Sequence, residues 1–213
     1  SISGHPWRHG DPVSTDHAVR AIHMGMTEID TALPEALLAR FAAIVGDANA
    51  LRAPDMVAPY LQEPRDLYAG QTALVLRPGS VEEVSAILRL ANETGTAIVP
   101  QGGNTGLVGA QSPRSKREVL VNLSRLDRIR DVDPQGFTMM VEAGVILERI
   151  QQAAADVDRL FPLTLASEGS CQIGGNISSN AGGTGVLAYG NTRDLVLGLE
   201  VVLPTGEIWN GLR

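Results

Sequence analysis

Apolar residues at helical spacing mark the first element that the chain predicts, a helix over residues 34–45. Pro34 stands where the first turn of a helix tolerates proline, and Gly46 ends the run. One face of this helix is apolar and would pack on a core. Its apolar positions are Leu37, Phe41, Ile44 and Val45.

The next apolar segments predict a strand–helix–strand unit. Ala73–Leu76 is a short apolar run, and Ser80 and Glu83 form a capping box at the start of a helix that Gly95 ends. A second strand follows at Thr96–Val99. Strand, helix and strand joined by short links predict a parallel pair with a right-handed crossover. The buried face of the helix would consist of Val81, Val84, Ile87, Leu88 and Ala91.

The later part of the chain predicts four strands, a helix and a charged segment. Period-two alternation and continuous apolar runs indicate the strands, and apolar residues three and four apart indicate the helix. In chain order these are a strand at Val119–Leu123, the charged segment Arg125–Asp133, a strand at Phe137–Glu142, a helix at Ile146–Val157, a strand at Leu195–Leu203 and its hairpin partner at Glu207–Asn210.

Two glycine-rich runs, Pro100–Gln111 and Ser167–Gly185, separate these apolar segments. Glycine lacks a Cβ, so its backbone approaches a ligand closely, and successive backbone N–H groups hold a pyrophosphate without using fixed charge. The first run follows the carboxyl end of the strand Thr96–Val99, where open α/β sheets place their ligands. One such run is equally typical of a surface loop. Two runs framed by strands favour a site for a large polar cofactor.

Composition narrows the class of ligand. The chain has 213 residues, a net charge of −7 and 4% aromatic residues, which argues against a nucleic-acid-binding surface. Its single cysteine, Cys171, fits a reducing compartment. No apolar stretch reaches the length of a membrane span, and the N-terminus has no apolar signal core. We therefore expect a soluble, cytoplasmic protein.

The first 26 residues differ from the rest of the chain. All four histidines, His5, His9, His17 and His23, lie there, without the spacing of a metal site. Because this segment also lacks periodicity, we predict a disordered or non-native leader at 1–26 and assign no metal ligands. A helical lead-in is predicted at 27–59 and the main domain at 60–213.

Three common site motifs are excluded. A phosphate loop of the Walker type needs Gly-Lys-Ser/Thr, but the only lysine, Lys116, follows a serine. The glycines of a dinucleotide fingerprint occur at Gly183 and Gly185, yet no strand precedes them. Since no histidine follows His23, neither a Ser-His-Asp nor a Cys-His arrangement can form in the main domain.

An ordered series of motifs gives a family resemblance. They are PQGGNTGLVG, EVLVNLSRLD, VEAGV, GSCQIGGNISSNAGG and YGNTRDLVLGLEVVLPTG, between Tyr60 and Arg213. This series resembles FAD-linked dehydrogenases of the vanillyl-alcohol oxidase superfamily, most of all the D-lactate and D-2-hydroxyglutarate dehydrogenase branch. The resemblance implies an α+β fold, a two-lobed PCMH-type FAD-binding domain with the flavin between the lobes. It also implies that the sequence stops before the end of that domain and before a substrate domain.

The resemblance assigns a place on FAD to each segment. The first run would wrap the pyrophosphate, the second would lie along the flavin and ribityl chain, and Val201 and Val202 would contact the adenine end. The expected cofactor-binding residues are Pro100, Gly102, Gly103, Asn104, Thr105, Gly106, Leu107, Gln111, Gly144, Ser167, Gly169, Gly174, Gly175, Asn176, Ser179, Asn180, Gly182, Val201 and Val202.

The mode of flavin attachment also follows from the resemblance. Some relatives tether FAD through a histidine in the first run or a cysteine in the second. Asn104 occupies the histidine position, and Cys171 lies too close to Gly174 for the cysteine pattern. We therefore predict non-covalent FAD and a buried structural thiol at Cys171.

The family's reaction is the transfer of a hydride from C2 of a 2-hydroxy acid to flavin N5, with a separate electron acceptor. Its base and metal-binding histidines come from a downstream substrate domain, so no catalytic residue is assigned here.

Homodimerisation is an open expectation, and Glu142 and Glu168 are either flavin-tuning groups or ordinary loop carboxylates. The alternative is a non-catalytic FAD-binding fragment. A nucleotide-sugar reductase of similar fold lacks visible signature residues.

Overall fold

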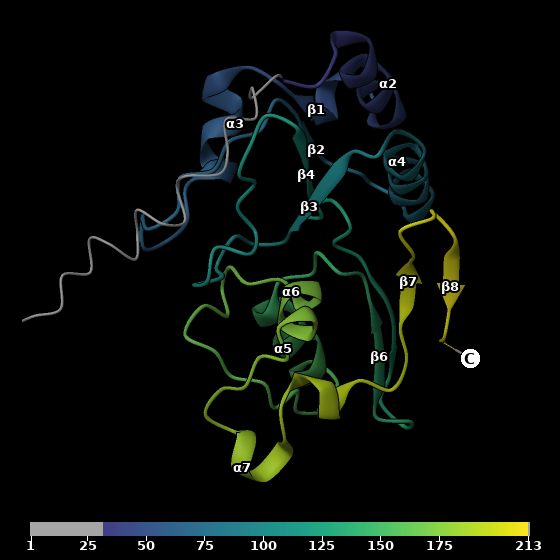
Figure 1. Cartoon of the computed structure of the whole chain (residues 1–213). Helices are drawn as coiled ribbons and strands as arrows, with labels where there is room; N and C mark the ends of the chain where they lie inside the picture. The colour runs from purple at the N-terminus through teal and green to yellow at the C-terminus, as the bar shows by residue number, and fades with distance from the viewer. Residues whose placement is uncertain (1–31, 213) are drawn as a thin grey trace, which may run out of the picture. The chain divides into compact units, whose positions relative to one another are not determined.

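The computed structural model describes residues 32–212, which fall within one compact unit (Figure 1). The predicted leader at 1–26 and the start of the lead-in lie outside the described residues. In chain order the elements are α2 (Glu35–Val45), the 3-10 helix η1 (Asp47–Asn49), β1 (Ala50–Leu51), α3 (Pro54–Leu61), β2 (Val75–Leu76), α4 (Val81–Thr94), β3 (Ala97–Gln101), β4 (Glu118–Asn122), β5 (Ile129–Asp133), β6 (Thr138–Val141), α5 (Leu147–Ala155), α6 (Ile173–Ser178), α7 (Val186–Tyr189), the 3-10 helix η2 (Thr192–Leu195), β7 (Glu200–Val202) and β8 (Ile208–Asn210).

The first lobe, from α2 to β4, is built on a four-stranded sheet of order β1-β2-β4-β3. β1 is antiparallel to β2, whereas β2, β4 and β3 are mutually parallel. The predicted parallel pair, β2 and β3, is therefore parallel but not adjacent, because β4 lies between them. Four of the five residues of β4 are buried, whereas most of β3 is not, so burial places β4 in the interior of the sheet.

Alternating residues of β2 and β4 supply the two faces of this sheet. Leu74, Leu76, Val119 and Val121 pack with α2 and α4 in one apolar cluster. Val75 and Leu120, which point to the opposite face, pack with Val57 of α3. The first lobe is thus a sheet between two helical layers.

The predicted caps of α4 are found with one difference. The Ser80 hydroxyl accepts a hydrogen bond from the Glu83 N–H at 3.2 Å, and Gly95 takes the left-handed conformation at φ 66°. The Glu83 carboxylate accepts from the N–H of Gly79 instead of Ser80. Of the predicted capping box, the Ser80 half forms, and the Glu83 carboxylate caps the N–H one residue earlier.

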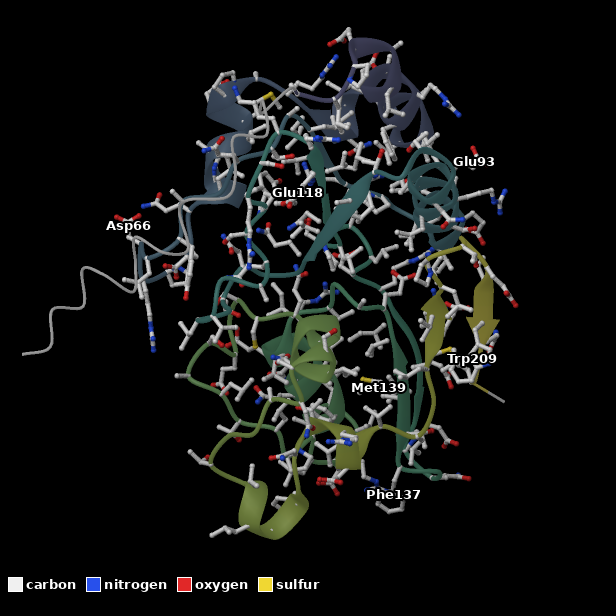
Figure 2. The ribbon with its side chains drawn as sticks, in the orientation of Figure 1. Asp66, Glu93, Glu118, Phe137, Met139 and Trp209 are labelled. Atoms are coloured by element: carbon white, nitrogen blue, oxygen red, sulfur yellow. The ribbon has the colours of Figure 1, made fainter. Side chains whose placement is uncertain are left out.

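The second lobe, from β5 to η2, has its own apolar clusters. In one, Val145, Ile150 and Ile173 join α5 and α6 to the antiparallel pair β5–β6, and Met139 of β6 packs on this cluster. Figure 2 shows Met139 beside β6, and Phe137 at the far end of the β5–β6 hairpin. In the other, Leu147 and Leu163 enclose Cys171. Separate cores give the chain the two lobes that the sequence predicts.

Three segments of the second half differ from the prediction. The charged segment Arg125–Asp133 contains β5, a strand that lacks a fully buried residue. The second glycine run contains the short helix α6, although glycine is a poor helix former. The predicted strand Leu195–Leu203 narrows to β7, and its first residue belongs to η2. Its hairpin partner β8 is confirmed, with Val201 opposite Trp209.

The β7–β8 hairpin reaches back to the first lobe. Its turn contains Gly206 at φ 83°, and the Gly206 carbonyl accepts a hydrogen bond from Ser85 of α4. Figure 1 shows this turn beside one end of α4. The hairpin therefore contacts α4 although more than a hundred residues separate the two.

Candidate functional site

The two glycine runs are in direct backbone contact. A Cβ on Gly103 would overlap the carbonyl oxygen of Ser170 and lie 3.3 Å from the Cα of Cys171. A Cβ on Gly102 would lie 3.2 Å from Oε1 of Gln172. The first run can approach the second this closely only because these positions are glycine.

Buried amide side chains hold the start of the first run. Nε2 of Gln101 donates to the carbonyls of Tyr60 and Gln111, at 2.8 and 3.2 Å. Nδ2 of Asn122 donates to the Gly102 carbonyl at 3.0 Å. Gln101 and Asn122 are buried and were not among the predicted site residues. The sequence offered no signal for them beyond polar residues at the ends of two strands.

The predicted residues further along this run are also fixed by hydrogen bonds. Asn104 adopts φ 56°, and its Nδ2 donates to the Gln62 carbonyl at 2.7 Å. Nε2 of Gln111 donates to the Gly106 carbonyl at 2.8 Å. Asn104 is thus tied to the segment that follows α3.

The segment before β2 supports the first run from outside. The buried carboxylate of Glu63 accepts hydrogen bonds from the N–H groups of Arg65, Leu67 and Tyr68. Burial raises the pKa of Glu63, but these three hydrogen bonds and the nearby Arg65 outweigh it and hold the pKa below its ordinary value. The Tyr68 ring packs against Gly109, where a Cβ would come within 2.8 Å. Glu63 therefore shapes a loop that braces the first run.

The second run is anchored on the loop after β6. The Gly174 N–H donates to the Ala143 carbonyl at 2.8 Å, and the Gly144 N–H donates to the Leu126 carbonyl at 2.7 Å. A Cβ on Gly174 would come within 2.8 Å of the Ala143 Cβ, whereas a Cβ on Gly175 would meet nothing within 4 Å. Gly174 is glycine because the protein packs against it. Gly175 faces open space, as a residue beside a ligand would.

The end of the second run is held by polar contacts. Asn180 adopts φ 48°, and its Oδ1 accepts from the Arg193 N–H at 2.9 Å. The Ser179 hydroxyl donates to the Gly175 carbonyl at 2.9 Å. Ser167 accepts from the N–H groups of Ser170 and Cys171 through its carbonyl. Cys171 is buried, as predicted.

The structure brings Gly102 and Gly103 of the first run against residues 170–172 of the second, and Gly174 against the loop that contains Gly144. Val201 and Val202 lie on β7, and among the described residues no hydrogen bond joins β7 to either run. Their predicted contact with the adenine end of FAD remains a prediction.

Glu142 is held in an ion-pair cluster. Its buried carboxylate accepts from the Arg128 backbone N–H at 3.0 Å and forms ion pairs with Arg128 at 2.8 Å and Arg130 at 3.2 Å. Burial raises the pKa of Glu142, but the hydrogen bonds from Arg128 and Arg130 outweigh this effect and leave it below the ordinary value. Glu168 accepts from Gln151 at 3.3 Å. Of the two roles left open for Glu142, these contacts favour the structural one.

Unsatisfied polar groups indicate what the runs bind. Within residues 32–212, the backbone N–H groups of residues 102–106 make no hydrogen bond with the protein. Three buried amide oxygens also lack a partner there: Oδ1 of Asn104, Oε1 of Gln172 and Oδ1 of Asn176. A buried acceptor without a partner costs about 1–3 kcal/mol. FAD offers phosphate oxygens for the N–H groups and hydroxyl or N–H donors for the amide oxygens, so the residues fit this cofactor.

The described residues hold no group of three His, Cys, Asp or Glu side chains close enough to share a metal ion. None of their helices combines the length and the apolar character needed to cross a bilayer.

The fold and the paired glycine runs define a two-lobed FAD-binding domain. A family profile described as FAD binding domain matches residues 72–211, and the chain belongs to this family. FAD is therefore the cofactor of this chain. The resemblance described from the motifs is therefore confirmed.

Related proteins support this assignment. The chain is 43% identical over 173 residues to the D-2-hydroxyglutarate–pyruvate transhydrogenase of Saccharomyces cerevisiae, covering 80% of this chain and 35% of that protein. It is 38% identical over 168 residues to the mitochondrial D-2-hydroxyglutarate dehydrogenase of Arabidopsis thaliana, covering 79% and 30%. The chain thus spans about a third of the length of these relatives.

Solved structures share the fold at lower identity. Alkyldihydroxyacetonephosphate synthase superposes with a TM-score of 0.76 at 20% identity, over 85% of this chain and 38% of that one. p-Cresol methylhydroxylase superposes with a TM-score of 0.67 at 23% identity, over 87% and 36%. The predicted PCMH-type fold is confirmed.

Proposed function

We propose that this chain is the FAD-binding part of a flavin-dependent dehydrogenase of D-2-hydroxy acids, with D-2-hydroxyglutarate or D-lactate as substrate. The observation that carries the proposal is the contact between the two glycine runs, lined by free N–H groups and unpartnered amide oxygens. The relatives named for D-2-hydroxyglutarate chemistry support the substrate class.

In this proposal the residues of the chain bind and orient the cofactor. The N–H groups of residues 102–106 hold the pyrophosphate, and the amide oxygens of Asn104, Gln172 and Asn176 accept hydrogen bonds from the rest of FAD. The Asn104 carboxamide is not a nucleophile, so the cofactor is held non-covalently. FAD held here would supply the acceptor for a hydride from C2 of the substrate. The base that removes the hydroxyl proton is not assigned to this chain.

The alternative is a FAD-binding chain without catalysis of its own. It is favoured by the absence of histidine after His23, because histidine is the commonest general base. In the dehydrogenase proposal the electron acceptor is a separate molecule. A cytoplasmic location and a homodimer remain predictions.

A flavin-bleaching assay separates the two functions. The chain is loaded with FAD under anaerobic conditions and mixed with D-2-hydroxyglutarate, D-lactate or, as controls, their L-enantiomers. Loss of the oxidised flavin absorbance with a D-acid, but not with its L-enantiomer, supports the dehydrogenase. If neither this chain nor a form that includes any coding sequence following Arg213 bleaches, the dehydrogenase proposal is wrong and FAD binding without catalysis remains.

A further inference from the structure

Arg130 joins two elements of the second half of the chain through one guanidinium. It lies at the bulge of β5, where the register with β6 shifts between Ile129 and Asp131. Its Nε forms an ion pair with Glu142 at 3.2 Å, and its Nη1 forms another with Glu200 of β7 at 2.9 Å. The side chains of Arg130, Glu142 and Glu200 are 29%, 2% and 21% exposed, so the cluster is largely shielded from water.

The Glu142 side of this cluster continues into the second glycine run. Ala143 follows Glu142 directly, and its carbonyl accepts the Gly174 N–H at 2.8 Å. Gly174 itself packs on Ala143 with no room for a Cβ. The backbone of Ala143 and Gly174 therefore couples the position of Glu142 to the position of the second run.

The Glu200 side holds a hairpin with few other attachments. Among the described strands, β7 pairs with β8 alone. The turn of the hairpin is tied to α4 through the hydrogen bond between Ser85 and Gly206. At the other end of β7, Glu200, the residue next to Val201, forms an ion pair with Arg130. Arg130 thus connects β7 to the second run.

We propose that Arg130 is a positioning residue for the cofactor. It fixes the position of β7 relative to the second glycine run. Val201 and Val202 then meet the adenine half of FAD while the run holds the flavin half. The proposal rests on the FAD site described under the proposed function. It predicts that breaking the Arg130–Glu200 pair weakens recognition of the adenine half without weakening recognition of the flavin half.

Arg128 provides a matched control within the same cluster. It pairs with Glu142 as Arg130 does, at 2.8 Å, but it makes no contact with β7 among the described residues. Arg128→Met removes a charge from Glu142 and leaves the link to β7 intact. Arg130→Met removes both. Glu200→Gln removes the charge on the β7 side and leaves both partners of Glu142 in place.

The test compares FAD with FMN, which lacks the adenine half. Dissociation constants are measured by flavin fluorescence titration for the original chain and the three variants. We expect Arg130→Met and Glu200→Gln each to weaken FAD about three- to tenfold more than they weaken FMN, the range for a partly shielded ion pair. Arg128→Met should leave the ratio of FAD to FMN affinity unchanged. The double variant Arg130→Met/Glu200→Gln should lose no more than either single variant.

Two other outcomes would contradict the positioning role or the FAD site itself. If Arg130→Met and Glu200→Gln keep the original FAD to FMN ratio, the positioning role is wrong although the FAD site stands. If the original chain binds neither flavin, the proposed function fails and this inference fails with it. Circular dichroism and thermal unfolding check that each variant is folded, and Glu200→Gln decides the matter if Arg130→Met is not.

Discussion

At the scale of single residues, the glycines of the site answer to two different constraints. A Cβ on Gly103 would overlap the Ser170 carbonyl, so the protein itself excludes any other residue there. A Cβ on Gly175 would meet no protein atom within 4 Å. Gly103 is therefore needed for the two runs to meet, whereas Gly175 leaves room that a ligand can use.

This difference predicts opposite behaviour for two alanine variants. Gly103→Ala should lower the free energy of unfolding by about 1–3 kcal/mol through overpacking, and it should lose FAD as a consequence. Gly175→Ala should unfold at the same or a higher temperature, because alanine favours the helix α6, and yet bind FAD more weakly. Urea unfolding and flavin titration measure the two effects. Full stability of Gly103→Ala would contradict the contact between the runs.

Glu142 gives the cluster a defined pH dependence. Since its pKa in the folded protein lies below the ordinary value of 4.5, its contribution to stability is present above that value and is lost as the pH falls through the lowered pKa. Glu142→Gln should lower the free energy of unfolding by ~1 kcal/mol at pH 7. The gap to the original protein should narrow as the pH falls below 4.5. An unchanged gap between pH 7 and pH 3 in urea unfolding would rule out the ionised carboxylate as its source.

At the scale of elements, segments with one clearly apolar face were predictable, and segments with several charged residues were not. The helices α2, α4 and α5 begin within one residue of the predicted positions, because each has one clearly apolar face. The strand β5 was missed because its exposed positions carry Arg130, Asp131 and Asp133. The place of β4 between β2 and β3 was also missed. A local pattern indicates a strand but not its neighbours in the sheet.

The segment around Glu63 supports the first run, although it is not glycine-rich itself. The carboxylate accepts three backbone N–H groups, so Glu63→Ala should leave these donors without a partner. We expect faster amide hydrogen exchange at Leu67 and Tyr68, and weaker FAD binding through Asn104 and Gln62. Glu93→Ala, an exposed change on α4, serves as the control and should leave both properties unchanged. Unaltered exchange at Leu67 would show that Glu63 does not hold this loop.

At the scale of the whole described chain, the site could be predicted but its supports could not. The glycine runs are continuous in sequence, so motif and spacing identify them. Their supports join distant positions, as in the bonds from Gln101 to Tyr60, from Asn104 to Gln62 and from Arg130 to Glu200. Nothing in local composition pairs such residues. Only the folded chain shows that the runs, the segment 60–62 and β7 are parts of one hydrogen-bonded arrangement.

A cofactor held between two lobes should stabilise both of them together. Ligand at one hundred times its dissociation constant adds about 2.7 kcal/mol to the free energy of unfolding, which for a chain of this size raises the melting temperature by roughly 5–10 °C. We expect FAD to shift the whole transition seen by far-ultraviolet circular dichroism, to which helices of both lobes contribute, without splitting it. Gly175→Ala, folded but weak in FAD binding, should show a smaller shift at the same FAD concentration. A transition that splits, with one part unmoved by FAD, would mean that FAD contacts a single lobe, and the site between the two glycine runs would then be wrong.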